Sequence, residues 1–199
     1  MQRASPPSIV HTGSTPRGHA IHALLVVSLA VNMAQAHQLR SVARDREQPN
    51  RLAAGKPMPA LQVRTASGAP ASLSFSGSSE STIIYYFSPS CRWCAINWPR
   101  VIELERATRG QHRFVAVSTA AAAELSTISH RVPFDVYGGL DDRARVASGL
   151  GGTPHTVVVS RDGRVLTSWM GAFRGRVEAD VEAYFRMSFS ERAAPGITP

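Results

Sequence analysis

The chain contains two cysteines, Cys91 and Cys94, and their spacing is the first indication of its chemistry. They form a Cys-x-x-Cys pair directly after residues 82–87, an apolar run typical of a buried strand. A thiol at the start of the helix that follows such a strand gains thiolate character from the helix dipole, and a neighbouring Arg92 adds to this effect. The second thiol, one turn away, can attack a disulfide formed by the first. The pattern therefore predicts that Cys91 attacks and Cys94 resolves.

Two other uses of the pair stay open at this stage. It could form a static structural disulfide, or it could bind a metal. Two cysteines are only half of a four-ligand zinc site, but Cys91, Cys94 and His155 together would suit copper, which prefers soft thiolates and imidazole. Strand alternation could instead turn His155 away from the thiols. We predict no metal, and no cofactor other than a redox-active disulfide between Cys91 and Cys94.

The remaining residues predict the elements that position this pair. Residues 120–131 have helical spacing, with Thr119 as the expected cap, and residues 132–137 form a short extended piece. The other expected elements are strands at 60–65, 71–75, 82–87, 112–118, 155–160 and 165–169, and helices at 95–106, 141–150 and 176–189. This order indicates an α/β sandwich with a central mixed sheet flanked by helices.

An apolar run at residues 20–36 predicts export or membrane attachment. It is either a membrane anchor at residues 20–39, which we favour, or a signal peptide cleaved near Ala36, since Ala34-Gln35-Ala36 fits the small-x-small rule. A buried core helix is the third and least favoured alternative. Either membrane interpretation places the body outside the cytoplasm, where a dithiol can cycle. The expected organisation is a disordered segment 1–19, the apolar helix, a linker 40–54, a domain 55–189 and a flexible tail 190–199.

The formal charge of +8 comes almost wholly from arginine. These arginines are scattered along the chain, and no nucleic-acid motif or basic stripe with interleaved aromatic residues accompanies them. We therefore predict a basic surface and no nucleic-acid partner.

Three groups of residues carry a resemblance to a known family. The first is the pair itself after its strand, with Pro99 five residues beyond Cys94. The second is residues 152–165, where Gly152-Thr153-Pro154 precedes a strand and an Asp-Gly hairpin, and the third is the lead-in at residues 55–59. Together they resemble the thioredoxin fold in its exported, often membrane-tethered TlpA/ResA-like branch of the redoxin superfamily.

The resemblance implies a function and a substrate site. Pro154 is expected to be a cis-proline facing the cysteines, the backbone of Thr153 to pair with an extended polypeptide, and Trp93 to cover the sulfurs and contact partners. The implied activity is that of an exported thiol–disulfide oxidoreductase. Its expected partners are extracytoplasmic protein disulfides, which it reduces, and an upstream electron donor. The alternative from a different class is a copper-binding assembly factor on the same fold. A redoxin-type peroxidase is disfavoured, because that motif requires threonine at the position of Ser88.

The chain departs from the family at two positions that matter for proton transfer. Thioredoxins carry a buried acid six residues before the first cysteine, where this chain has Tyr85. The TlpA-like branch often has glutamate three residues after the second cysteine, where this chain has Asn97. We therefore treat Tyr85 and Asn97, with Arg92, as modulators of the dithiol.

Overall fold

The computed structural model describes residue 22 and residues 25–36 and 52–190. It divides into two units, Met1–Pro49 and Asn50–Pro199. In the first unit residues 25–36 are helical, and their large apolar side chains are exposed. Of the helices within the described ranges, none combines the length and the apolar character needed to cross a bilayer. The predicted segment 1–19, the predicted tail 190–199 apart from Ser190, most of the linker 40–54, and both ends of the predicted anchor lie outside the described residues.

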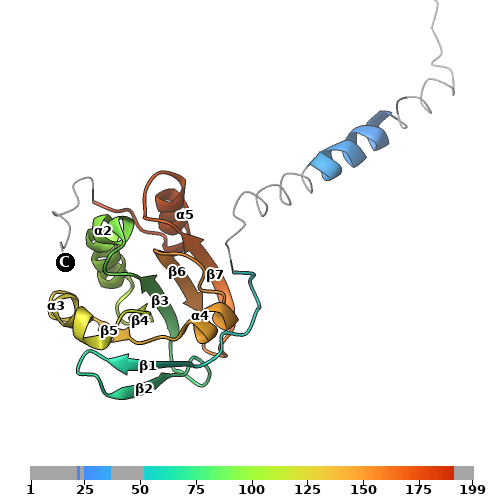
Figure 1. Cartoon of the computed structure of the whole chain (residues 1–199). Helices are drawn as coiled ribbons and strands as arrows, with labels where there is room; N and C mark the ends of the chain where they lie inside the picture. Colours follow the sequence, from blue (N-terminus) through green and yellow to red (C-terminus); the bar gives the residue numbers. More distant parts are fainter. Residues whose placement is uncertain (1–21, 23–24, 37–51, 191–199) are drawn as a thin grey trace, which may run out of the picture. The chain divides into compact units, whose positions relative to one another are not determined.

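A seven-stranded mixed sheet organises residues 52–190, with the strand order β2-β1-β5-β4-β3-β6-β7 (Figure 1). Strands β3, β4 and β5 are parallel to one another, whereas β6, β7, β1 and β2 are joined by antiparallel pairing. The strands are β1 (Leu61–Thr65), β2 (Pro70–Leu73), β3 (Ser81–Phe87), β4 (His112–Ser118), β5 (Asp135–Gly138), β6 (His155–Val159) and β7 (Val165–Met170).

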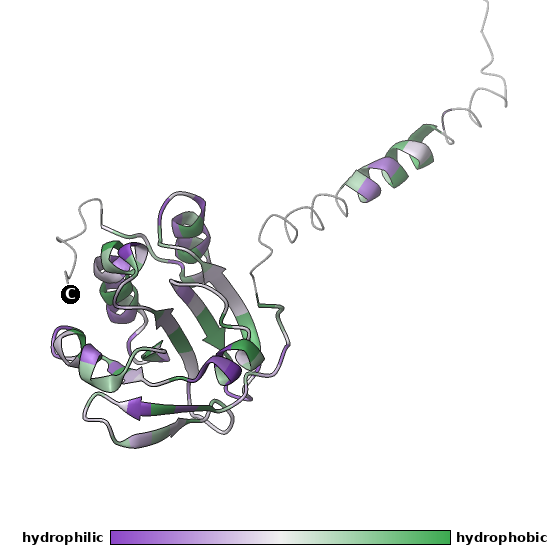
Figure 2. Cartoon of the chain, viewed as in Figure 1, coloured by the Kyte–Doolittle hydropathy of each residue, from purple (hydrophilic) through white to green (hydrophobic). Residues whose placement is uncertain are grey.

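Helices cover both faces of this sheet, which is why β3 is buried from Thr82 to Phe87. The elements are α2 (Arg92–Thr108), the 3-10 turn η1 (Ala122–Leu125), α3 (Ser126–Ser129), α4 (Asp142–Ser148) and α5 (Arg176–Phe185). Figure 2 shows hydrophobic residues along the central strands, while the helices carry both polar and apolar residues. The predicted α/β sandwich is therefore present.

Alternation along β3 sorts its side chains between two cores. Ile83, Tyr85 and Phe87 pack with residues of α2 and α5, including Trp98 and Val181. Ile84 and Tyr86 pack on the opposite side of the sheet, with residues of β1 and with Leu150 after α4. The face on which a β3 residue lies therefore decides whether it belongs to the layer that contains Cys94.

Three predicted helices differ from the structure. The helix expected at residues 120–131 is wrong: only η1 and the single turn α3 form there. Serine hydroxyls of α3 donate to nearby backbone carbonyls, which competes with a regular helix. Thr119 is not its cap, because the segment begins at Ala121, whose amide donates to Glu124.

The helix after the cysteines begins at Arg92, earlier than predicted, and the closing helix ends at Phe185 instead of residue 189. Arg186 adopts a left-handed conformation, with φ of 54°, and this ends α5. The following residues turn back to α2, where the amide of Ser190 donates to Glu103 at 2.6 Å. Phe189 stacks against Phe173 there.

Candidate active site

The two thiols occupy unequal positions at the start of α2. Cys91 is the N-cap, and its Sγ accepts a hydrogen bond from the amide of Cys94 at 3.2 Å. It is half-buried, whereas Cys94, one turn inside the helix, is buried in the core beneath it. The two cysteines are not bonded to each other in this structure. An N-cap sulfur receives amide donors and the positive end of the helix dipole, which favour a thiolate.

The environment separates the pKa values of the two thiols. Burial alone would raise the pKa of Cys91, but hydrogen bonds from Cys94, from Thr153 and from the amides of Cys94 and Trp93 outweigh it, so this pKa is lowered. Burial raises the pKa of Cys94 to about 12, and the hydrogen bond and the charge of Cys91 act in the same direction. Near neutral pH, Cys91 is therefore the thiol that supplies the thiolate.

The loop before β6 faces these sulfurs. The Thr153–Pro154 peptide bond is cis, as the resemblance implied. The Cys91 thiol donates to the carbonyl of Thr153 at 3.6 Å, and the Thr153 side chain contributes to the pKa of both cysteines. Pro154 is buried, and its carbonyl accepts from the amide of Gly171 at 2.8 Å. Residues far apart in the sequence thus meet where β3 ends and its neighbour β6 begins.

Exposed side chains surround the accessible thiol. Trp93 is 52% exposed and Ile96 39%, although both are large and apolar. Arg92 is exposed beside them. This small apolar surface next to Cys91 is suited to contact with a polypeptide.

Both positions at which the chain departs from the family lie beside Cys94. Tyr85 is fully buried in the same core layer, and the amide of Asn97 donates to its hydroxyl at 3.4 Å. The amide of Phe173 in turn donates to Oδ1 of Asn97 at 2.7 Å. Sequence reasoning missed Phe173, because its contribution is a backbone amide and no side-chain pattern marks it.

His155 does not join the thiols. It pairs across the sheet with Tyr86 and Met170, and the residues that alternate with it, Val157 and Val159, belong to the core on the opposite face from Cys94. Burial lowers the pKa of His155 to about 4, so its ring is neutral near pH 7. Within residues 22, 25–36 and 52–190, no cluster of three or more His, Cys, Asp or Glu side chains is arranged to hold a metal. His155 therefore does not complete the copper site suggested for Cys91 and Cys94.

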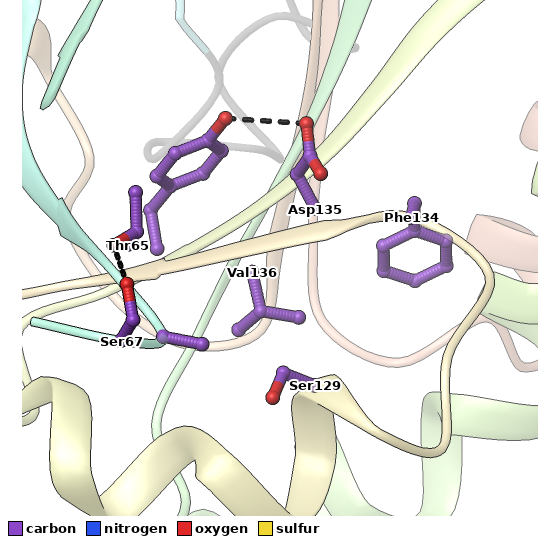
Figure 3. Close-up of a pocket in the computed structure, with 8 residues that line it drawn as sticks. Thr65, Ser67, Ser129, Phe134, Asp135 and Val136 are labelled. Atoms are coloured by element: carbon purple, nitrogen blue, oxygen red, sulfur yellow. Dashed lines mark hydrogen bonds between the residues drawn. The ribbon is translucent and has the colours of Figure 1, made fainter. Parts of the chain in front are cut away.

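A separate hollow of about 290 Å³ lies beside β1 and β5, on a different part of the sheet (Figure 3). The hydroxyl of Tyr137 donates to Asp135 at its rim, at 3.2 Å. Its lining contains no cysteine or histidine and is made of Thr65, Ala66, Ser67, Ser129, Phe134, Asp135, Val136 and Tyr137. It is not part of the dithiol site.

Comparison with known proteins gives matches among solved structures alone: no family model and no curated protein matches the chain. A protein from Chlorobium tepidum assigned as the thiol:disulfide interchange protein DsbE superposes with a TM-score of 0.56, at 21% identity, over 68% of this chain and 94% of that one. The chain has the thioredoxin fold.

Two further solved structures with this thioredoxin fold are informative. A secreted disulfide oxidoreductase from Mycobacterium tuberculosis, homologous to Escherichia coli DsbE, has a TM-score of 0.51 at 17% identity, over 63% of this chain and 93% of that one. A peroxiredoxin-like protein from Aquifex aeolicus has a TM-score of 0.51 at 14% identity, over 60% and 76%. Both confirm the fold that the sequence predicts.

The inequality of the two thiols predicts selective alkylation. Because the pKa of Cys91 is lowered and that of Cys94 is raised to about 12, iodoacetamide at pH 7 is expected to modify Cys91 and leave Cys94 intact. The thiolate fraction of Cys91 grows as pH rises through its pKa, so the alkylation rate should rise and then level off at a lower pH than for an unperturbed cysteine. Mass spectrometry of the digested reduced protein locates the adduct. Equal labelling of both cysteines at pH 7 would contradict the assignment.

Proposed function

We propose that this chain is an exported thiol–disulfide oxidoreductase that reduces disulfides of extracytoplasmic proteins. The observation that carries the proposal is that the two thiols beside the cis Thr153–Pro154 bond differ. Cys91 is half-buried and its pKa is lowered, whereas Cys94 is buried and its pKa is raised. Such a pair is suited to attack followed by resolution. The structural likeness to thiol:disulfide interchange proteins supports this reaction class.

The reaction has two balanced steps. The Cys91 thiolate attacks one sulfur of the partner disulfide, forming a mixed disulfide while the other partner sulfur leaves with its electron pair and takes a proton. The Cys94 sulfur then attacks Cys91, which forms the Cys91–Cys94 disulfide and releases the second partner thiol. The partner gains two electrons and the dithiol loses two, so an upstream donor must reduce the enzyme again.

Three residues are proposed to bind the partner. The exposed ring of Trp93 offers apolar contact next to Cys91. The backbone of Thr153, whose carbonyl already lies 3.6 Å from the Cys91 sulfur, would pair with an extended segment on either side of the partner cysteine. Pro154 leaves this strand end without an amide donor, so that the partner chain approaches the sulfurs directly.

Trapping the mixed disulfide tests this function. In the Cys94→Ser variant, Cys91 can attack but the resolving thiol is missing, so partner proteins are expected to remain covalently bound. Diagonal electrophoresis, with reduction before the second dimension, detects them. The matched control is the Cys91→Ser, Cys94→Ser double variant, which should trap none. If both variants carry the same adducts, or neither carries any, the proposed function is wrong.

The direction of electron flow can be measured separately. Burial works to raise the pKa of Cys91, and among the described residues the main groups that lower it are hydrogen-bond donors of Cys94, Thr153 and Trp93 and not cations. A strong oxidant needs a greatly stabilised reduced form. Equilibration of Cys91 and Cys94 with glutathione is therefore expected to give a potential near that of thioredoxin, about −270 mV, rather than about −120 mV as in DsbA. A value near the latter would reverse the assigned direction.

Export is proposed from residues 20–36, and the secreted protein from Mycobacterium tuberculosis supports it by analogy. Anchor and signal peptide differ in the mature mass. An anchored chain keeps its N-terminus and sediments with membranes, whereas cleavage after Ala36 yields a soluble protein that begins at His37. Fractionation and intact mass of the full chain distinguish these two, and a full-length protein in the cytoplasm would contradict both.

A further inference from the structure

Cys94 lies in a layer where the described chain has no nearby buried carboxylate to take its proton. Among the described residues, the buried carboxylate is Glu105, which lies eleven residues further along α2, about 16 Å away. It is occupied there by a two-fold hydrogen-bonded pair with Arg109, at 2.8 and 2.9 Å. No arginine or lysine side chain among the described residues is buried either, so a buried group that stabilises the resolving thiolate in this layer must be neutral.

The hydrogen bonds around Asn97 run in one direction. Oδ1 of Asn97 accepts from the amide of Phe173, which fixes the orientation of the side-chain amide, and its Nδ2 then donates to the oxygen of Tyr85. A phenol has one proton to donate. Because the Tyr85 oxygen already accepts from Asn97, its own O–H is free to point toward another acceptor.

Cys94 is the acceptor in reach. The cross-strand neighbour of Tyr85 on β6 is Thr156, but its buried Oγ1 makes no hydrogen bond within the described chain, so the phenol does not donate to it. Tyr85 and Cys94 belong to the same buried core layer, and Asn97, whose side-chain amide donates to the Tyr85 oxygen, lies one turn after Cys94 on α2. Burial is the largest cause of the raised pKa of Tyr85, and the charge of Cys94 and a hydrogen bond with its side chain act in the same direction, so the phenol is protonated near neutral pH.

We propose that the neutral Tyr85 hydroxyl donates a hydrogen bond to the sulfur of Cys94 and thereby stabilises the resolving thiolate. Asn97 is a positioning residue that orients this hydroxyl. This inference rests on the proposed thiol–disulfide function. In the resolving step the Cys94 proton is lost to solvent, the Cys94 thiolate bonds to Cys91, and the partner sulfur leaves with the electron pair and takes a proton. Tyr85 keeps its proton throughout, unlike a carboxylate base.

The groups that face Cys94 are few. The titratable groups that interact with it are Cys91 and, from β3, Tyr85 and Tyr86, while the Ser88 backbone and Thr153 contribute neutral groups. His155 pairs with Tyr86, which packs on the opposite face of the sheet from Cys94. A single ionisation, that of Cys94 itself, should therefore govern the pH dependence of resolution.

The test is a two-phase reaction of the reduced full chain with dithiobis-nitrobenzoate, a chromogenic aryl disulfide. Attack by Cys91 releases the first nitrothiolate, and resolution by Cys94 releases the second. Tyr85→Phe keeps the ring that packs against Phe87 and Trp98 but removes the donor. It is expected to slow the second phase roughly tenfold, as loss of a hydrogen bond to a charged group would, and to leave the first phase unchanged. The log rate of resolution should rise by one unit per pH unit in both proteins.

Two further variants separate positioning from packing. Tyr86→Phe removes the hydroxyl of the next residue on β3, which lies on the opposite face, and should leave both phases at the wild-type rate. Asn97→Ala should slow the second phase when Tyr85 is present but have little additional effect in the Tyr85→Phe background, because both act through one donor. Thermal unfolding of each variant checks that it is folded.

The outcomes distinguish this inference from the proposed function. If wild type shows no first phase, Cys91 is not a nucleophile and the proposed function fails. If wild type shows both phases but Tyr85→Phe resolves at the wild-type rate, or Tyr86→Phe is slowed as much, the inference alone is overturned. Additive effects of Asn97→Ala and Tyr85→Phe would likewise contradict a shared donor.

Discussion

Replacing Cys91 by serine is expected to lower the rate of insulin disulfide reduction by more than about three orders of magnitude. A serine hydroxyl does not ionise near neutral pH, so the hydrogen bonds from the Cys94 amide and from Thr153 have no thiolate to stabilise. The buried Cys94 cannot substitute, because its pKa is raised to about 12. Turbidity of the precipitating insulin chains, with dithiothreitol as donor, measures the rate.

The matched control is Ser90→Ala, which changes the exposed residue before Cys91 and leaves both thiols in place. Its insulin reduction should stay within about twofold of wild type. The Cys91→Ser protein should keep the wild-type unfolding midpoint, because the substituted atom is half-buried and similar in size. Retention of even a tenth of wild-type activity in Cys91→Ser would show that attack does not occur at this sulfur.

Trp98→Ala is expected to lower the free energy of unfolding by about 3–5 kcal/mol, the usual cost of truncating a large buried aromatic side chain. Trp98 is 2% exposed. Its ring meets those of Tyr85 and Phe87 edge-on, with centroids at 5.1 and 5.0 Å, and stacks on Phe134 at 6.4 Å. The substitution therefore removes aromatic contacts between α2 and β3, the two elements that hold the dithiol. Urea unfolding followed by circular dichroism measures the change.

Trp93→Ala provides the comparison within the same helix. This tryptophan is 52% exposed, so its loss should change the free energy of unfolding by less than about 0.5 kcal/mol. It should instead weaken the interaction with protein partners, which appears as a higher KM for insulin. If Trp93→Ala destabilised the fold as much as Trp98→Ala, the division between an inner and an outer tryptophan would be wrong.

Much of the fold could be predicted because its signals are local. The apolar run of β3, the Asp162-Gly163 turn and the Gly152-Thr153-Pro154 motif each lie within a few residues of one another, and the structure has the expected elements there. The helix predicted at residues 120–131 was wrong because that prediction, too, relied on a local signal. Their helical spacing is real, but hydrogen bonds tie Ala120 to Ser118 and to Gly139, and these tertiary and turn contacts outweigh a weak helical propensity.

By itself the sequence determined that two thiols one helical turn apart follow a buried strand, and that tyrosine and asparagine stand where the family resemblance leads us to expect acids; that Pro154 faces the thiols was an expectation from the same resemblance. Which residues share a face was decided by the tertiary structure alone, because the register of β6 against β3 sets every side chain on one side or the other. That register turns His155 away from the sulfurs. Asn97 accepts from the amide of Phe173, 76 residues distant, next to the layer that contains Tyr85 and Cys94, and no local pattern encodes such a contact.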